Sequence, residues 1–93
     1  MSALDQILIV DDQENNRLVV EDHLRKLRCK IIGASSGEEA LEKLSVIEPD
    51  CILMDIMMPV MDGVEATRRI KSIKAFEEIP ILMITARDEA SAL

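Results

Sequence analysis

Three aspartates and one threonine of this chain lie just after short apolar segments. Asp11 and Asp12 form an adjacent pair, Asp55 lies near the middle of the chain, and Thr85 lies near its end. If the apolar segments are neighbouring parallel strands, these four side chains meet at the edge of the sheet where the strands end. Three carboxylates that converge at one place repel one another and require a cation or protons. The pattern therefore predicts a cation-binding site.

Magnesium is the cation that these side chains favour. Mg²⁺ is bound by carboxylate and carbonyl oxygens and retains several waters, whereas the imidazole and thiolate ligands that zinc prefers do not accompany these aspartates in the sequence. A carboxylate beside bound Mg²⁺ can attack a phosphorus atom and form an aspartyl phosphate. The hydroxyl of Thr85 would then hydrogen-bond a phosphoryl oxygen and detect the added group. This arrangement predicts a phosphorylation switch.

Four short apolar runs predict strands, and the segments between them predict helices. Three of the four runs are apolar almost without interruption, as expected for strands that helices cover on both faces. Short, right-handed connections then give an open, doubly wound parallel sheet of the α/β class. The predicted strands are Gln6–Val10, Lys30–Ala34, Cys51–Met54 and Ile81–Ile84.

The predicted helices carry apolar residues at helical spacing on one side. The first spans Asn16–Leu27, and the second begins at Ser36, which forms a capping box with Glu39. The third spans Val64–Ile73, and a further helix is expected near the end of the chain with Asp88 as its N-cap. The expected buried stripes are Val20, Leu24 and Leu27 on the first helix, Leu41, Leu44 and Ile47 on the second, and Val64, Thr67, Ile70 and Ile73 on the third.

Length and composition predict one globular domain spanning residues 1–93. Of the 93 residues, 48% are hydrophobic and 31% charged, which argues against disorder. No segment approaches the roughly 18 apolar residues of a membrane span, and the N-terminus lacks the features of a signal peptide, so a cytoplasmic location is expected. The net charge of −7 disfavours binding to nucleic acid or to an anionic membrane. Cys29 and Cys51 are isolated and are interpreted as packing residues.

Three segments of the sequence resemble the response-regulator receiver family of two-component signalling. They are ILIVDDQEN, DCILMDIMMPVMDGVEATRRIK and IPILMITA, and the resemblance covers nearly the whole chain. Each segment alone is weak evidence, but their order and spacing are jointly very specific. The resemblance implies a flavodoxin-like strand order 2-1-3-4, as in the chemotaxis regulators of this family.

The resemblance also implies a role for each candidate residue. Asp55 matches the phosphorylated residue, and Thr85 matches the switch hydroxyl. Asp12 and Asp55 match the direct carboxylate ligands of Mg²⁺, the backbone carbonyl of Met57 matches the third protein ligand, and Asp11 would reach the metal through water. The domain would take its phosphoryl group from a sensor histidine kinase or a phosphotransfer protein and change conformation, without turning over a substrate as an enzyme does.

Two further expectations concern the loop after Asp55 and the end of the chain. Pro59 fixes φ, and Gly63 is expected to adopt a backbone conformation that other residues resist, so both shape the loop. The family has a fifth strand with a phosphate-pairing Lys and a fifth helix, and this sequence ends at Leu93 before either. The domain is therefore expected to be incomplete at its C-terminus, to belong with an output domain, and to self-associate through the edge of its fourth strand.

Three other functions share parts of this pattern. A hydrolase or phosphotransferase acting on a small phosphorylated substrate usually has a second acid two residues after its nucleophile, where this chain has Met57. A flavin-binding electron carrier has the same sheet topology, but Phe76 is the one aromatic residue available to stack on a flavin. A receiver-like interaction module that is never phosphorylated is the third alternative, and phosphotransfer competence distinguishes it.

The remaining notable residues have simpler interpretations. His23 is expected to be a solvated helix residue rather than a ligand or phosphorelay histidine. The methionines of segment 54–61 are expected to pack in the core or the loop rather than to bind a soft metal. The basic residues of segment 68–74 are expected to form the solvated face of the third helix. The serines at 35–36 are interpreted as capping residues, since no general base accompanies them.

Overall fold

The computed structural model describes residues 6–84, so the expectations for Thr85 and for a helix at Asp88 lie outside the described range. Within it, a parallel sheet has the strand order β2-β1-β3-β4, which confirms the predicted doubly wound α/β class and strand order. The strands are β1 (Gln6–Val10), β2 (Lys30–Ala34), β3 (Cys51–Asp55) and β4 (Ile81–Ile84); the helices are α1 (Glu14–Leu24), α2 (Gly37–Leu44) and α3 (Gly63–Lys71); short 3-10 turns form η1 (Arg25–Leu27) and η2 (Lys74–Phe76).

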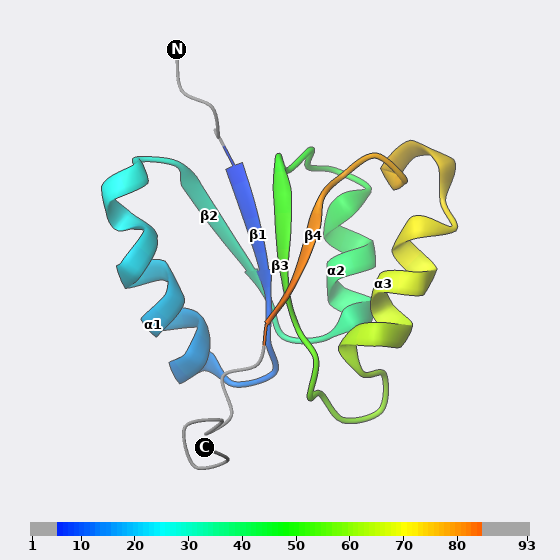
Figure 1. The fold of residues 1–93 in the computed structure, drawn as a ribbon, viewed down its shortest axis with the longest axis horizontal. Helices are drawn as coiled ribbons and strands as arrows, with labels where there is room; N and C mark the ends of the chain where they lie inside the picture. The colour runs from blue at the N-terminus through cyan, green and yellow to red at the C-terminus, as the bar shows by residue number, and fades with distance from the viewer. Residues whose placement is uncertain (1–5, 85–93) are drawn as a thin grey trace.

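Helices cover both faces of the sheet. Figure 1 shows α1 on one face and α2 with α3 on the other. Strand β1 lies inside the sheet, hydrogen-bonded to β2 on one side and β3 on the other, and its residues from Ile7 to Val10 are at most 2% exposed. Leu8 and Val10 join the core beneath α2 and α3, while Ile7 and Ile9 alternate toward α1. This two-sided burial explains the uninterrupted apolar run of β1.

Helix α1 covers its face of the sheet lightly. It begins at Glu14, two residues before the predicted Asn16, and no residue of α1 is buried. Val20 and Leu24 are half-buried, whereas Leu27 is 49% exposed. The predicted stripe is wrong at Leu27 because this residue lies in the 3-10 turn η1, where the rotation per residue differs from that of an α-helix.

The packed faces of α2 and α3 depend on small residues. Each face combines a glycine, an alanine and one large aliphatic side chain, so the two helices can approach each other and the sheet closely. The buried residues are Gly37, Ala40 and Leu44 in α2, and Gly63, Ala66 and Ile70 in α3.

The predicted stripe of the third helix is therefore wrong at both of its ends. Val64 is 60% exposed, because the face that turns inward is the one that carries Gly63 and Ala66. Ile73 is 39% exposed and lies beyond Lys71, where α3 ends. For the second helix the prediction holds for Leu44, while Leu41 is only partly buried against the core. Ile47 is also partly buried but lies beyond Leu44, where α2 ends.

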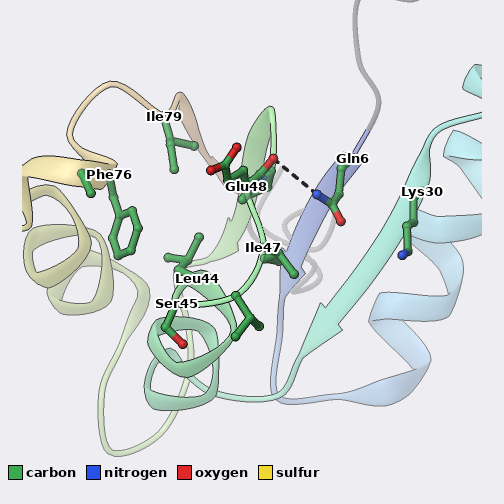
Figure 2. A pocket seen from close by; sticks show the side chains of 11 residues that line it. Gln6, Lys30, Leu44, Ser45, Ile47, Glu48, Phe76 and Ile79 are labelled. Carbon is green, nitrogen blue, oxygen red and sulfur yellow. Dashed lines mark hydrogen bonds between the residues drawn. The ribbon is translucent and has the colours of Figure 1, made fainter.

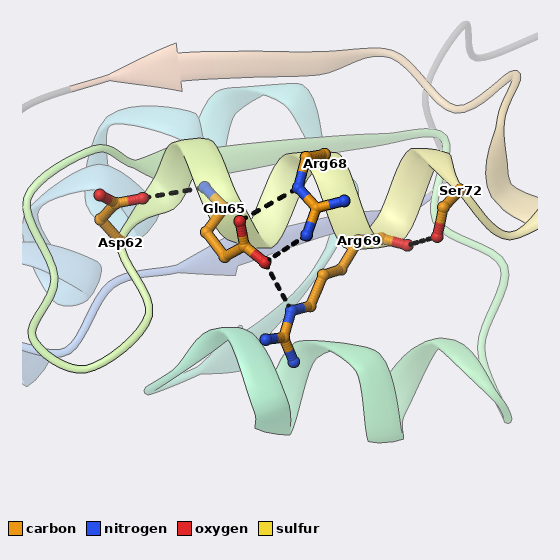
Figure 3. Close-up of polar contacts among 5 residues, drawn as sticks. All are labelled: Asp62, Glu65, Arg68, Arg69 and Ser72. Atoms are coloured by element: carbon orange, nitrogen blue, oxygen red, sulfur yellow. Dashed lines mark hydrogen bonds and ion pairs between the residues drawn. The ribbon is translucent and has the colours of Figure 1, made fainter.

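Helix α3 begins at the N-cap Asp62, which was not predicted from the sequence although an aspartate followed three residues later by a glutamate is a helix-start signature. The side chain of Asp62 accepts a hydrogen bond from the Glu65 N–H at 2.8 Å, as Figure 3 shows. The carboxylate of Glu65 accepts hydrogen bonds from the guanidinium groups of Arg68 and Arg69, which lower the pKa of Glu65 to about 2. The basic segment is thus largely an exposed helix face, as predicted, although the Lys71 ammonium donates to the carbonyl oxygens that precede β4.

Strand β4 leaves apolar side chains exposed. It pairs with β3 in parallel, and Leu82 and Met83 are 57% and 38% exposed.

Among residues 6–84, none of the helices has the length and apolar character that crossing a membrane would require.

Ser36 caps α2 as predicted, accepting a hydrogen bond from the Glu39 N–H at 3.0 Å. The carboxylate of Glu39 does not return to Ser36, however, but accepts hydrogen bonds from the N–H and hydroxyl of Ser35. These bonds, the backbone one foremost, lower the pKa of Glu39 to about 2 from an ordinary 4.5, and Lys43 adds to the effect.

Replacing Glu39 by Gln is expected to remove a pH-dependent part of the free energy of unfolding. Because the folded pKa is lower, the charge of Glu39 stabilises the fold fully above the ordinary pKa of 4.5, and this contribution is lost as the pH falls through about 2. At neutral pH we expect Glu39→Gln to lose about 1 kcal/mol, a value reduced for solvent screening because the side chain is 36% exposed. Denaturant unfolding across this pH range should show the two proteins converging toward the acid end.

A Glu38→Gln variant is the matched control, because it removes the same charge from the same helical turn but leaves the Ser35 contacts in place. Its stability should differ less from the parent chain. A loss in Glu39→Gln that does not change with pH would contradict the assigned cause.

Candidate metal centre

The carboxylates of Asp11, Asp12 and Asp55 converge at the carboxyl edge of the sheet. One ligand oxygen from each lies within 4.8 Å of the other two. Since β1 and β3 are parallel neighbours whose register pairs Val10 with Met54, the next residues of the two strands fall side by side. Asp11 and Asp55 are 1% and 2% exposed, so two of the three like charges lie out of contact with solvent. Such a group requires a compensating positive charge.

Three hydrogen bonds, two to backbone groups and one from the Arg17 side chain, fix the position of Asp11. Its N–H donates to the carbonyl oxygen of Ala34 at 3.0 Å, which extends the β1–β2 pairing by one residue. Its carboxylate Oδ1 accepts from the Gln13 N–H at 2.9 Å, and its carbonyl oxygen accepts from the Arg17 Nη1 at 2.6 Å. The side chain of Asp11 is therefore turned back along its own loop.

Asp55 is the last residue of β3, one residue beyond the predicted end of this strand. Its carboxylate Oδ1 accepts a hydrogen bond from the Met57 N–H at 3.1 Å, which limits rotation of the carboxylate. The next peptide is also anchored, because the Ile56 N–H donates to the Ile84 carbonyl oxygen at 2.9 Å. The end of β3 is thus tied both to its own loop and to β4.

The third acid, Asp12, has a buried oxygen that carries the best evidence for a cation. Within residues 6–84, Oδ1 of Asp12 is shielded from solvent and has no hydrogen-bond partner. Leaving a buried polar atom unsatisfied costs about 1–3 kcal/mol, and more for a charged group. A hard cation bound by carboxylate oxygens would remove this cost, and the all-oxygen donor set fits Mg²⁺. The residues present therefore fit the expected metal.

The loop after Asp55 is shaped differently from the sequence prediction. Gly63 does not have a positive φ, so its role is not an unusual backbone conformation. A Cβ on Gly63 would instead lie 2.2 Å from the Asp55 carbonyl oxygen, so only glycine lets the start of α3 approach β3 this closely. The positive φ of this loop falls on Val60, at 66°.

The remaining candidates take up ordinary positions where the structure describes them. His23 is exposed, and its Nδ1 lies 2.8 Å from the Val19 carbonyl oxygen. The cysteines are half-buried and free, and burial raises the pKa of Cys51. Of the methionines in segment 54–61, Met54, Met58 and Met61 are buried in the core as expected, whereas Met57 is 50% exposed.

A hollow in the surface lies at the opposite edge of the sheet, where the strands begin. It has a volume of about 1010 Å³ and is bordered by the segment that leads into β3 and by η2 (Figure 2). Its lining includes Leu44, Ile47, Phe76 and Ile79, together with Gln6, whose side-chain amide donates to the Glu48 carbonyl oxygen. Within the described part of the chain, the one group of three acids suited to a metal is therefore the cluster at the carboxyl edge, away from this hollow.

Comparison with known proteins points to one family. The family model described as the response regulator receiver domain matches residues 7–93. The alkaline phosphatase synthesis transcriptional regulatory protein PhoP of Bacillus subtilis is 40% identical over 84 residues, which cover 90% of this chain and 34% of PhoP. The chain thus spans about a third of the length of that relative.

Two solved structures share the fold. The N-terminal domain of a response regulator receiver protein from Methanoculleus marisnigri is 42% identical with a TM-score of 0.84, and the match covers 98% of this chain and 76% of that one. The receiver domain of a sensor histidine kinase from Pseudomonas aeruginosa, solved with a magnesium ion coordinated in its active site cleft, is 35% identical with a TM-score of 0.81. That match covers 92% of this chain and 70% of the other.

Val60→Gly is expected to raise the free energy of unfolding by about 1 kcal/mol. A β-branched residue in the left-handed region costs about 1–3 kcal/mol, whereas glycine adopts it at an entropic cost of about 0.5–1 kcal/mol. The side chain of Val60 is fully exposed, so its removal sacrifices no packing. Denaturant unfolding of the two proteins measures the difference.

Val46→Gly provides the matched control, since Val46 is 81% exposed and is not among the non-glycine residues of 6–84 that have a positive φ. That substitution should destabilise the fold. Equal losses in the two variants would show that the backbone at Val60 is not strained.

Proposed function

This chain belongs to the response regulator receiver domain family, and from this premise we propose that Asp55 is the residue that accepts a phosphoryl group. The donor would be a sensor histidine kinase or a phosphotransfer protein. The observation that carries the proposal is the convergence of Asp11, Asp12 and Asp55 within 4.8 Å at the carboxyl edge of the sheet. Of the three, Asp55 is the last residue of β3 and directly precedes the loop that leads to α3. An incoming phosphoryl group would be received beside this loop.

Four residues would bind the metal, and one of them, Asp55, would also react with the phosphoryl group. Asp12 and Asp55 would bind Mg²⁺ directly, Asp11 through water, and Met57 through its backbone carbonyl. When bound, Mg²⁺ neutralises charge on the transferred group. A carboxylate oxygen of Asp55 forms the new bond to phosphorus as the bond from phosphorus to the donor imidazole breaks. The Met57 N–H, which holds the Asp55 carboxylate, keeps it oriented for this attack.

Propagation of the signal would begin where β3 and β4 end. The Ile56 N–H is bonded to the carbonyl oxygen of Ile84, the residue that precedes Thr85. A phosphoryl group on Asp55 would therefore be added close to Ile84, which directly precedes the proposed switch residue Thr85 in the sequence. In a longer regulator, the resulting change of conformation would pass to an output domain.

We propose that this domain is not a turnover enzyme. A phosphoester hydrolase of similar architecture would place a second acid at the position of Met57, and this side chain supplies no acid or base. Residues 1–93 would act as one receiver domain, and its cytoplasmic location stays a prediction.

Self-association through β4 is a separate expectation. Leu82 and Met83 are exposed, and within residues 6–84 β4 pairs only with β3, so its outer edge offers hydrogen-bonding groups to another chain. The mass measured by light scattering should rise with protein concentration, and Leu82→Lys should suppress the rise. A parent chain with the same mass at all concentrations would refute the expectation.

A small phosphodonor such as acetyl phosphate is expected to add a single phosphoryl group to this chain, on Asp55 and only with a divalent cation present. The reason is that the acidic cluster both binds the cation and contains the attacking carboxylate. Intact-mass measurement should detect one added group in the parent chain and none in Asp55→Asn.

Asp62→Asn is the control for this experiment, because Asp62 lies in the same loop but caps α3 instead of joining the cluster. It should be modified like the parent chain. Modification of Asp55→Asn to the same extent as the parent would overturn the assignment.

A further inference from the structure

Arg17 connects three elements that meet at the acidic cluster. It lies on α1, and its half-buried side chain reaches back toward the end of β1, where Nη1 donates to the Asp11 carbonyl oxygen at 2.6 Å. On the way it crosses β2 at Gly33. A Cβ built on Gly33 would lie 3.2 Å from both Cδ and Nε of Arg17. Arg17 thus joins α1, β1 and β2 at a single point.

The oxygen that Arg17 holds belongs to the peptide unit that links Asp11 to Asp12. This unit is planar, so a bond that fixes its carbonyl oxygen also fixes the plane from which the Asp12 backbone continues. Asp11 is already held on its other side by the Ala34 carbonyl oxygen and the Gln13 N–H. Nothing comparable holds Asp12, whose Oδ1 is buried without a hydrogen-bond partner in residues 6–84. The direction of the Asp12 carboxylate therefore depends on this peptide plane.

The absence of a side chain at Gly33 leaves room for the side chain of Arg17. Register pairs Gly33 with Ile9 of β1, on the face of the sheet that α1 covers. Any side chain at this position would stand in the path of the arginine, at a distance tighter than most Cβ contacts. An alanine here would have to displace the arginine stem, and the guanidinium would shift with it.

We propose that Arg17 is a positioning residue for the metal centre: it orients the Asp11–Asp12 peptide so that Asp12 faces the cation, and Gly33 keeps its path open. This inference rests on the proposed function, in that it takes the acidic cluster to bind Mg²⁺. Arg17 itself touches neither the cation nor the phosphoryl group. Its planar guanidinium is well suited to this task, because a lysine offers a single flexible ammonium instead of a rigid set of donors.

The test is the dissociation constant of Mg²⁺, measured by calorimetric titration in Arg17→Met, which keeps an apolar stem but removes the hydrogen-bond donors. We expect binding about tenfold weaker than in the parent chain, as is typical when a residue that orients a metal ligand is lost. Arg17→Lys should fall between the two. In cation-free protein, the Asp12 amide resonance should shift in Arg17→Met, which shows a change of the peptide without reference to activity.

The variant Gly33→Ala provides an independent test of the same role. It should weaken Mg²⁺ binding several-fold in the parent chain and cause no further loss when combined with Arg17→Met, because the arginine through which it acts is then absent. Arg25→Met is the matched control, since Arg25 is exposed, pairs with Asp22, and lies in η1 beyond the C-terminal end of α1, whereas Arg17 lies near the N-terminal end. It should bind Mg²⁺ like the parent. If Arg17→Met fails to fold, Arg17→Lys and Gly33→Ala decide the question by the same measurement.

The outcomes distinguish a failure of the positioning role of Arg17 from a failure of the proposed metal site. A parent chain that binds no Mg²⁺, or an Asp12→Asn variant that binds it normally, would overturn the metal site itself. Loss of binding in Asp12→Asn with unchanged binding in Arg17→Met would overturn only the positioning role. That role is equally overturned if Arg17→Met lowers the unfolding free energy but leaves both the dissociation constant and the Asp12 amide resonance unchanged.

Discussion

The repulsion among three carboxylates within 4.8 Å is the constraint on which the rest of this structure depends. Two of them are almost fully buried because they continue β1 and β3, the two strands at the centre of the sheet. The apolar core that stabilises these strands therefore also brings the like charges together. The fold tolerates this because backbone N–H groups bind Asp11 and Asp55, and because the cluster suits a divalent cation.

The strands, their order and the convergence of the acids could be predicted from the sequence because each has a local cause. An uninterrupted apolar run such as Gln6–Val10 indicates a strand buried on both faces, and parallel strands then place the residues after them at one edge. The cap at Ser36 was also predictable, since its signature lies within four residues. Roles for Asp55 and Met57 came only from resemblance to a family, and the structure leaves them as proposals.

What the sequence could not reveal depends on distances between segments far apart in the chain. Gly37 and Ala66 are core residues because α2 and α3 pack closely, whereas hydropathy favoured the larger Val64, which is exposed. Gly63 was predicted to provide an unusual backbone conformation. It is needed instead because a side chain at this position would collide with the Asp55 carbonyl oxygen. The bond from Arg17 to Asp11 has no sequence signature, because it requires a small residue on a third element.

The light attachment of α1 has a consequence for the dynamics of the acidic cluster. Since no residue of α1 is buried, few apolar contacts oppose its detachment, and it should open at a lower free energy than the sheet, which native-state amide exchange would reveal. Each opening of α1 would carry away Arg17 and release the peptide between Asp11 and Asp12. Ion affinity would then include the equilibrium for docking of α1, so a partner that bound the outer side of this helix could tune the metal centre without touching it.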